Sequence, residues 1–158
     1  MKEETCHATT VLIDNGFTGY AIMSYPFVKK LGYKFQQSKG ESYHAMTGNM
    51  NTLHSVTVTN VCLPHLSCQR TFTATFEVAP PESGDFGYRI IMGIGMMDEL
   101  GINQSCTDKI ITWGHDVQVP MVPIGYWTDA CIQRICKHAN TEKEHTDSAS
   151  KNQEGKFR

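Results

Sequence analysis

The chain has 158 residues, of which 40% are hydrophobic, and a formal charge of −2 from 14 basic and 16 acidic side chains. This length fits one domain with a short extension, and the charge balance lacks the basic excess that is usual in nucleic-acid-binding domains. Apolar runs stay well short of the roughly 20 residues that a membrane-spanning helix needs, so we expect neither nucleic acid nor membrane as a partner of this domain.

The chain begins with two short apolar segments on either side of a polar loop. Residues 9–13 are β-branched and apolar, which predicts a buried strand, and residues 20–24 predict a second strand. Residues 25–31 predict a helix, because Pro26 suits its first turn and Gly32 suits its end.

The middle of the chain predicts strands that pair as hairpins. Residues 34–38 form a short strand candidate. Residues 42–47 and 51–58 flank Gly48-Asn49, a turn signal that predicts a β-hairpin. Apolar and polar side chains alternate cleanly in residues 71–78, so we expect this strand to bury one face, which carries Phe72, Ala74, Phe76 and Val78.

The following segment alternates strand and turn signals. Residues 89–92 predict a buried strand, and residues 96–100 predict a helical turn that ends at Gly101. Residues 109–113 and 116–120 predict a final hairpin, and the tryptophan in it is expected in the core.

The composition changes near residue 126. Residues 128–137 predict a short helix, whereas residues 138–158 are almost wholly polar. Such a segment buries too little apolar surface to offset the entropy of ordering, so we expect a disordered linker or tail. The prediction is one domain over residues 5–125, followed by the helix and tail of residues 126–158.

Asp14 is the first candidate for chemistry, because it follows three apolar strand residues and precedes Asn15-Gly16. Taken alone, Asn-Gly between apolar runs is a strong turn signal, and an aspartate there usually caps the turn. A catalytic carboxyl is the alternative, and a second segment far along the chain favours it.

That second segment reads Ile90-Ile91-Met92-Gly93, followed by Leu100-Gly101-Ile102 and then Ile111-Thr112-Trp113. With the Asp14 loop, and in this order, it resembles the retropepsin-like aspartic protease domain of gypsy-like LTR retrotransposon polyproteins. The resemblance covers most of residues 9–123. It implies a mainly β, single-lobe acid-protease barrel, closed or nearly closed, with one or two short helices.

The resemblance also implies roles for particular residues. Asp14 would be catalytic, and Asn15 and Gly16 would complete its loop. A hairpin that covers the substrate, the flap, would carry Thr47, Gly48 and Asn49 near its tip. The apolar strand that braces the loop from behind would contribute Ile91, Met92 and Gly93.

The chemistry of this family needs two carboxyl groups that share one proton, because like charges so close together do not both ionise. In this chain only Asp14 follows an apolar strand and leads directly into Asp-x-Gly. An active enzyme must therefore be a C2 homodimer that acts on a peptide or polyprotein substrate.

Asn15 departs from the family, which has Ser or Thr at this position to lock the two loops of the dimer together. The amide of Asn15 carries both a donor and an acceptor, so a related bond is available to it. Three alternatives follow: an active endopeptidase, a decayed copy, and a likeness of structure only. The non-enzymatic reading is a dimerisation or peptide-binding module.

The cysteines are the remaining candidates. The polar first six residues lack the apolar stretch of a secretory signal, so we expect a cytoplasmic protein with thiols rather than disulfides. Cys62, His65 and Cys68 have the spacing of zinc ligands, but structural zinc takes four and nothing nearby fixes the fourth. We expect a loop there, no bound metal and, since Gly93-Ile94-Gly95 lacks the third glycine of a nucleotide loop, no cofactor.

Overall fold

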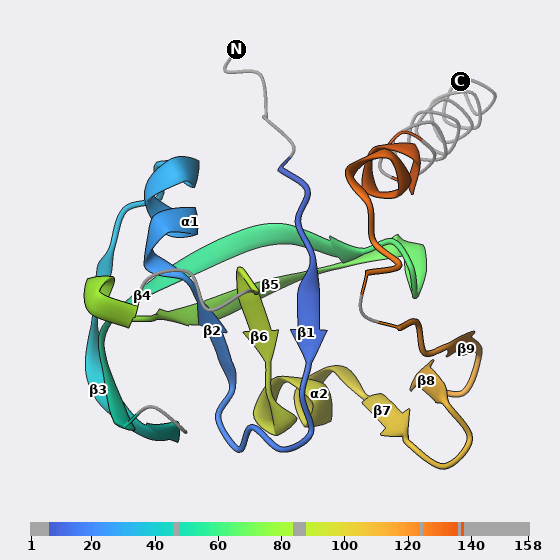
Figure 1. The fold of residues 1–158 in the computed structure, drawn as a ribbon, viewed down its shortest axis with the longest axis horizontal. Coiled ribbons are helices and arrows are strands. Elements are labelled where there is room, and N and C mark those ends of the chain that lie inside the picture. Colours follow the sequence, from blue (N-terminus) through green and yellow to red (C-terminus); the bar gives the residue numbers. More distant parts are fainter. Residues whose placement is uncertain (1–6, 46–47, 84–87, 124, 136, 138–158) are drawn as a thin grey trace, which may run out of the picture.

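Figure 1 shows the fold in a computed structural model, which describes residues 7–45, 48–83, 88–123, 125–135 and 137. The fold class is mainly β, as predicted. The elements are β1 (Val11–Ile13), β2 (Ala21–Met23), α1 (Tyr25–Leu31), β3 (Gln36–Ala45), β4 (Gly48–Leu63), β5 (Ser67–Val78), the 3-10 turn η1 (Pro81–Ser83), β6 (Ile90–Met92), α2 (Ile94–Leu100), β7 (Ile102–Ser105), β8 (Ile110–Trp113) and β9 (Val117–Pro120).

The strands form two open sheets rather than the closed or nearly closed barrel that we expected. Six strands pair in the order β1-β6-β2-β5-β4-β3, and β7-β8-β9 form a separate antiparallel sheet. Within the described residues, β1 and β3 are the two ends of the larger sheet and do not pair with each other. Strand β4 also carries an irregularity, because its register with β5 shifts between Val58 and Val61, where Asn60 has φ of 55°. Such a bulge bends a strand and increases its twist.

Strand β6 is the centre of the arrangement around the candidate site. It lies between β1 and β2, parallel to the first and antiparallel to the second. Met92 is paired with Ile13 on one side and with Ala21 on the other. Strand β2 is buried along its whole length and joins β6 to the long β4–β5 hairpin.

Helix α1 has the predicted bounds, whereas α2 ends as predicted but begins at Ile94, two residues before the predicted start. Helix α1 has Pro26 in its first turn, and Gly32 ends it with φ of 70° and an amide that donates to the carbonyl oxygens of Val28 and Lys29. Gly101 ends α2 in the same left-handed conformation, with φ of 72°. A residue without Cβ adopts this conformation without strain, which is why glycine marks both ends.

The β3–β4 hairpin exists as predicted, but its turn is displaced. We expected the turn at Gly48-Asn49, and both residues instead begin β4, opposite Ala45 and His44. The residues that connect Ala45 to Gly48 are 46–47, which lie outside the described residues. Pairing across the whole hairpin sets this register, and it overrides the local turn signal.

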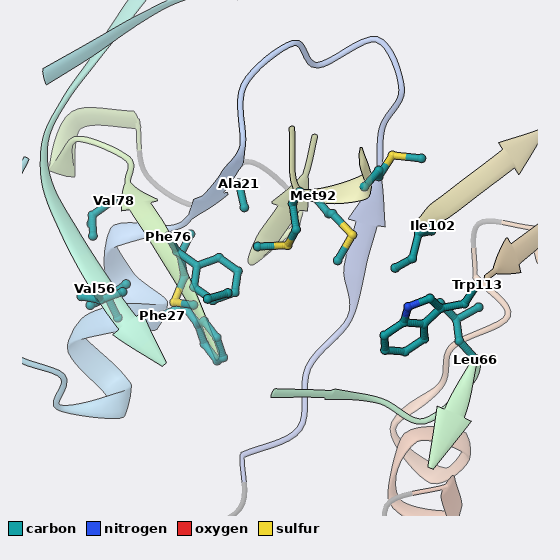
Figure 2. Close-up of a cluster of buried hydrophobic side chains, with 14 residues drawn as sticks. Ala21, Phe27, Val56, Leu66, Phe76, Val78, Met92, Ile102 and Trp113 are labelled. Carbon is teal, nitrogen blue, oxygen red and sulfur yellow. The ribbon is translucent and has the colours of Figure 1, made fainter. Parts of the chain in front are cut away.

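The core lies between the long hairpin, β2, β6 and the helices, and in the view of Figure 2 Met92 lies between its two halves. Predicted alternation in β5 is confirmed, since Ala74, Phe76 and Val78 are buried and Phe72 packs against the cluster. Trp113 is also buried, and its indole nitrogen donates to the carbonyl oxygen of Leu100 at 2.8 Å. This bond fastens β8 to the end of α2. Other buried members of the core are Ala21, Met23, Phe27, Val28, Val56, Leu66, Met96, Met97 and Ile102.

The C-terminal segment is helical over residues 129–135, within the predicted range of 128–137. Thr128 caps this helix, because its hydroxyl accepts the amide of Cys131 at 3.3 Å. Trp127 packs edge-on against His65 and Tyr126, at ring distances of 5.0 Å. The polar tail of residues 138–158 lies outside the described residues, and the division at residue 125 stays a prediction. In the part of the chain that the structure describes, every helix is too short or too polar to span a membrane.

A charged clasp joins the two sheets. The guanidinium of Arg70 on β5 donates to both carboxylate oxygens of Asp116 at 2.6 Å and to the carbonyl oxygen of Trp113 at 3.0 Å. It also lies 5.2 Å from the centre of the Trp113 ring. The hydrogen bonds from Arg70 lower the pKa of Asp116 below its ordinary value, so the ionised carboxylate is favoured in the folded protein.

We expect Asp116→Asn to lower the midpoint of thermal unfolding at pH 7 by a few degrees at most, because both partners stay partly exposed. Since the folded state lowers this pKa, the contribution of the carboxylate is present above about pH 4 and is lost as the pH falls through the lowered value. Thermal scans at pH 7 and near pH 2.5 measure it, with Asp98→Asn, an exposed carboxylate on α2, as the control. A difference between wild type and Asp116→Asn that persists undiminished at the lower pH contradicts the clasp.

Candidate active site

The site begins where β1 ends. The amide of Asp14 donates to the carbonyl oxygen of Met92 at 3.0 Å, which continues the pairing of β1 with β6 by one residue. The chain then turns sharply, and the amide of Phe17 donates back to the carbonyl oxygen of Asp14 at 3.2 Å. Strand β1 is half-buried rather than buried as predicted, and the position of Asp14 is fixed by this strand on one side and a closed turn on the other.

The carboxylate of Asp14 is held by its own loop. Oδ1 accepts the amide of Gly16 at 2.8 Å, an Asx-type turn. A Cβ atom on Gly16 would lie 3.1 Å from the same oxygen, tighter than most side-chain contacts. The arrangement fits both a capped turn and an oriented carboxylate, because a fixed Oδ1 leaves the second oxygen in a defined direction.

The predicted bracing strand lies against this loop. Gly93 follows β6 directly, and its amide donates to the carbonyl oxygen of Tyr20 at 2.8 Å. The next two amides, of Ile94 and Gly95, donate to the carbonyl oxygens of Phe17 and Gly19 at 2.9 and 3.1 Å. Three consecutive backbone bonds thus fasten the second half of the loop to the start of α2.

Gly93 is required here for space. Its backbone, with φ of −94° and ψ of −178°, is one that any residue adopts. A Cβ atom would lie 2.3 Å from the carbonyl oxygen of Gly19 and 2.5 Å from the ring of Phe17. No atom tolerates such distances, so the loop approaches β6 this closely only because position 93 lacks a side chain.

Around the aspartate the surface is open. Asn15 and Gly16 are exposed, and Ile94 is 38% exposed although it is a large apolar residue. Within the described residues the side chain of Asn15 makes no hydrogen bond inside the subunit. Its amide is therefore available to a second molecule that approaches this face.

The predicted flap residues are only partly brought to the site. Thr47 lies outside the described residues, and Gly48 and Asn49 belong to the start of β4. Asn49 is engaged across the hairpin, where its Oδ1 lies 2.6 Å from Nδ1 of His44. What reaches the loop is Tyr43 on β3.

The Tyr43 ring lies 5.0 Å from the ring of Phe17 at an angle of 53°. Sequence reasoning missed this pair. Its only local signal was an aromatic residue directly after Asp14-Asn15-Gly16, and nothing in the sequence joined it to residue 43.

Two tyrosines around the loop have raised pKa values. Burial raises the pKa of Tyr43 to about 12, assisted by the charges of Glu41 and Glu77. For Tyr20, burial and a hydrogen bond with Glu99 raise the pKa to about 12 as well. Both phenols therefore stay neutral at any physiological pH, and Tyr20 connects the loop to α2 through Glu99.

The alternative zinc site receives no support. His65 is turned toward the C-terminal segment, with Nε2 at 3.3 Å from the carbonyl oxygen of Pro120 and its ring against Trp127. Thiol groups of Cys62 and Cys68 contact carbonyl oxygens of their own turn. Across the described ranges, no three or more His, Cys, Asp or Glu side chains are grouped to hold a metal ion.

Comparison with known proteins gives likenesses of structure but none of sequence. No protein-family model matches the chain, and no curated protein matches it. Among solved structures it is similar to the retroviral protease-like domain of Ddi1 from Leishmania major, with 12% sequence identity and a TM-score of 0.48 over 75% of this chain and 88% of that one. Because both values are low, this likeness carries no inference about the chemistry of Asp14.

We expect Gly93→Ala to destabilise the fold by roughly 1–3 kcal/mol or more, because the added methyl group meets two backbone carbonyl oxygens as well as the Phe17 ring. Gly95→Ala is the matched control, since its Cβ would have contacts of 3.3–3.4 Å and a gain in helix propensity offsets them. Urea unfolding followed by circular dichroism measures both variants. Equal stability of the two would contradict the close approach at Gly93.

The raised pKa values predict an alkaline transition. Contributions of the neutral Tyr20 and Tyr43 phenols to stability are complete below about pH 10 and are lost as the pH rises toward 12. At about pH 11 the folded protein should therefore show less tyrosinate absorbance than the same protein in urea. Tyr43→Phe should reduce this difference in absorbance between the folded and the unfolded protein by about half. A difference unchanged by the substitution would mean that Tyr43 ionises normally.

Proposed function

We propose that the chain is one subunit of a homodimeric aspartic endopeptidase, in which Asp14 and its copy in a second subunit activate a water molecule. One observation carries the proposal. The carboxylate of Asp14 is oriented by the Gly16 amide, in a loop packed without a gap on Gly93, at a face whose neighbouring residues are exposed.

The need for a second copy follows from the chemistry. General acid–base hydrolysis requires one carboxylate to accept a proton from water while a second carboxyl group donates one to the scissile carbonyl oxygen. The water oxygen bonds to the carbonyl carbon, the carbon–nitrogen bond then breaks, and the amine leaves with the proton that the first carboxylate took from water. The former carbonyl oxygen returns its proton to the second carboxylate as the new carboxyl group forms. Each subunit supplies one Asp14, so a two-fold axis beside the loop completes the pair.

The fixed geometry of each loop suits this role. Two carboxylates that share a proton must be held at a constant separation, because a small displacement changes both pKa values. Asp14 is held through its backbone by Met92 and through Oδ1 by Gly16. These contacts leave its second oxygen for the partner subunit or for water.

The proposed substrate is an extended peptide that lies between the Asp14 loop and the β3–β4 hairpin. An extended chain offers backbone groups at both edges, which suits binding beside strands. Thr47, Gly48 and Asn49 would cover it as the flap. A polyprotein of the retrotransposon type, cleaved in the cytoplasm, is the source that the sequence resemblance implies.

The competing candidate is a non-catalytic dimerisation or peptide-binding module. It is favoured by Asn15, whose exposed amide stands where the resembling family has a hydroxyl. An amide is larger than a hydroxyl and must fit the same junction between two loops. If it holds the two loops too far apart, the dimer binds peptides and does not cleave them.

We expect wild type to cleave a mixed peptide library at about pH 5, where a shared-proton pair is active, and Asp14→Asn to abolish cleavage. Mass spectrometry of the products measures it across a series of protein concentrations, because the rate should rise with the dimer fraction. Asp98→Asn is the matched control and should keep full activity.

One combination of results would contradict the proposed endopeptidase activity. A protein that sedimentation shows to be dimeric and circular dichroism shows to be folded, yet that cleaves nothing, would contradict the endopeptidase and favour the binding module. Asn15→Ser then separates the two remaining causes. Restored cleavage would place the defect at Asn15, whereas continued inactivity would place it elsewhere in the site.

A further inference from the structure

We propose that Phe17 and Tyr43 form an aromatic latch that holds the β3–β4 hairpin against the Asp14 loop. Both would then be positioning residues, which act through the loop and the hairpin rather than on the substrate. The catalytic part of this inference rests on the proposed function. The latch itself rests only on contacts within one subunit.

Phe17 is a rigid anchor because its backbone is bonded on both sides. Its amide donates to Asp14, and its carbonyl oxygen accepts the amide of Ile94 from the start of α2. The ring therefore has a fixed origin, three residues from the carboxylate. A displacement of this ring would therefore also displace the turn that orients Asp14.

Two glycines make the slot that the ring occupies. A Cβ atom on Gly93 would lie 2.5 Å from one edge of the Phe17 ring. On Gly19 it would lie 2.5 Å from the far end of that ring and 2.6 Å from the Tyr43 ring. Both rings thus fill space that any other residue at position 19 would take, so the pair is a built contact rather than a chance approach at the surface.

The hairpin reaches this slot by bending. Strand β3 changes register between Gln37 and Glu41, where Gly40 has φ of 81°. The buried hydroxyl of Thr52 lies 3.3 Å from the amide nitrogen of Glu41 and 3.4 Å from its carbonyl oxygen, so it bridges the bulge. Within the bulge, the hydroxyl of Ser38 donates to Oε1 of Glu77 on β5 at 3.0 Å.

Beyond the bulge, toward Ala45, the end of the hairpin lies near the loop that follows β1, as Figure 1 shows. Within the described residues, Tyr43 makes the ring contact that joins this part of the hairpin to the loop. Tyr43 is half-buried, which agrees with a side chain that lies against the subunit. The latch therefore sets how far the hairpin stands from Asp14.

The distance between the hairpin and Asp14 would determine how tightly a peptide is held beneath the hairpin. Losing the Tyr43 ring should leave Asp14 with its bonds to Met92 and Gly16, so the chemical step of bound substrate is little changed. Binding should weaken, because the hairpin no longer has a fixed position. The expected signature is therefore a raised KM, roughly three- to tenfold for an aromatic pair, with kcat nearly unchanged.

Hydrogen–deuterium exchange tests the latch without any activity. We expect Tyr43→Ala to speed exchange of amides in residues 41–45 and 17–19 by roughly three- to tenfold, with amides 14–16 unchanged. Gly19→Ala should do the same, because its methyl group separates the rings without removing either. Tyr43→Phe keeps the ring and should match wild type, and Tyr33→Ala controls for the loss of an exposed tyrosine.

The outcomes separate this inference from the proposed function. Unchanged exchange in Tyr43→Ala would overturn the latch, whatever the protein does to peptides. Faster exchange in both segments, with Tyr43→Phe unchanged, supports it even if wild type cleaves nothing. In an active protein, a fall in kcat at constant KM for Tyr43→Ala would point to lost folded protein and would overturn the positioning role.

Discussion

The position of β6 between β1 and β2 is the constraint on which the rest of the structure depends. Its last residue pairs with both neighbouring strands, and the glycine that follows lets the loop between them close onto it. Three backbone bonds then carry the loop into α2. These contacts are made by backbone atoms and by the missing side chain of Gly93, and none of them involves the side chain of Asn15. The exposed side chain of Asn15 is therefore accommodated without disturbing the turn.

The two open sheets are held together by side chains from one long hairpin. Phe72 packs edge-on against Trp113, and Arg70 grips the turn between β8 and β9. Trp113 also bonds to the end of α2, so the smaller sheet is connected to the same helix that braces the loop. Trp113 therefore packs against Phe72, donates a hydrogen bond to Leu100 and contacts Arg70, which also forms the ion pair with Asp116. A sheet that stays open at β1 leaves the candidate site at an accessible edge, where a second subunit has room to approach.

A single carboxylate in an exposed loop is an incomplete catalyst, and the surroundings of Asp14 fit that state. Its backbone is rigid, one oxygen is satisfied within the loop, and an apolar residue beside it is exposed. The hairpin that would cover a peptide is tied to the same loop through two aromatic rings. In the proposed enzyme, the site and the hairpin that covers it are thus connected within one subunit, whereas the proposed chemistry requires two subunits. Dimer formation, rather than a movement within the subunit, would complete such a site.

Local signals in the sequence determined the helix at residues 25–31, most of the second helix (residues 96–100 of 94–100), their glycine stops, the alternation of β5 and the turn that carries Asp14. Each depends on neighbours a few residues apart, through backbone dihedral preferences and side-chain periodicity. Only the tertiary structure decided the hairpin register at Gly48, the strand at residues 102–105, the open sheets and the Phe17–Tyr43 contact. These depend on pairing and burial between segments far apart in sequence, and long-range packing overrides local preference wherever the two conflict.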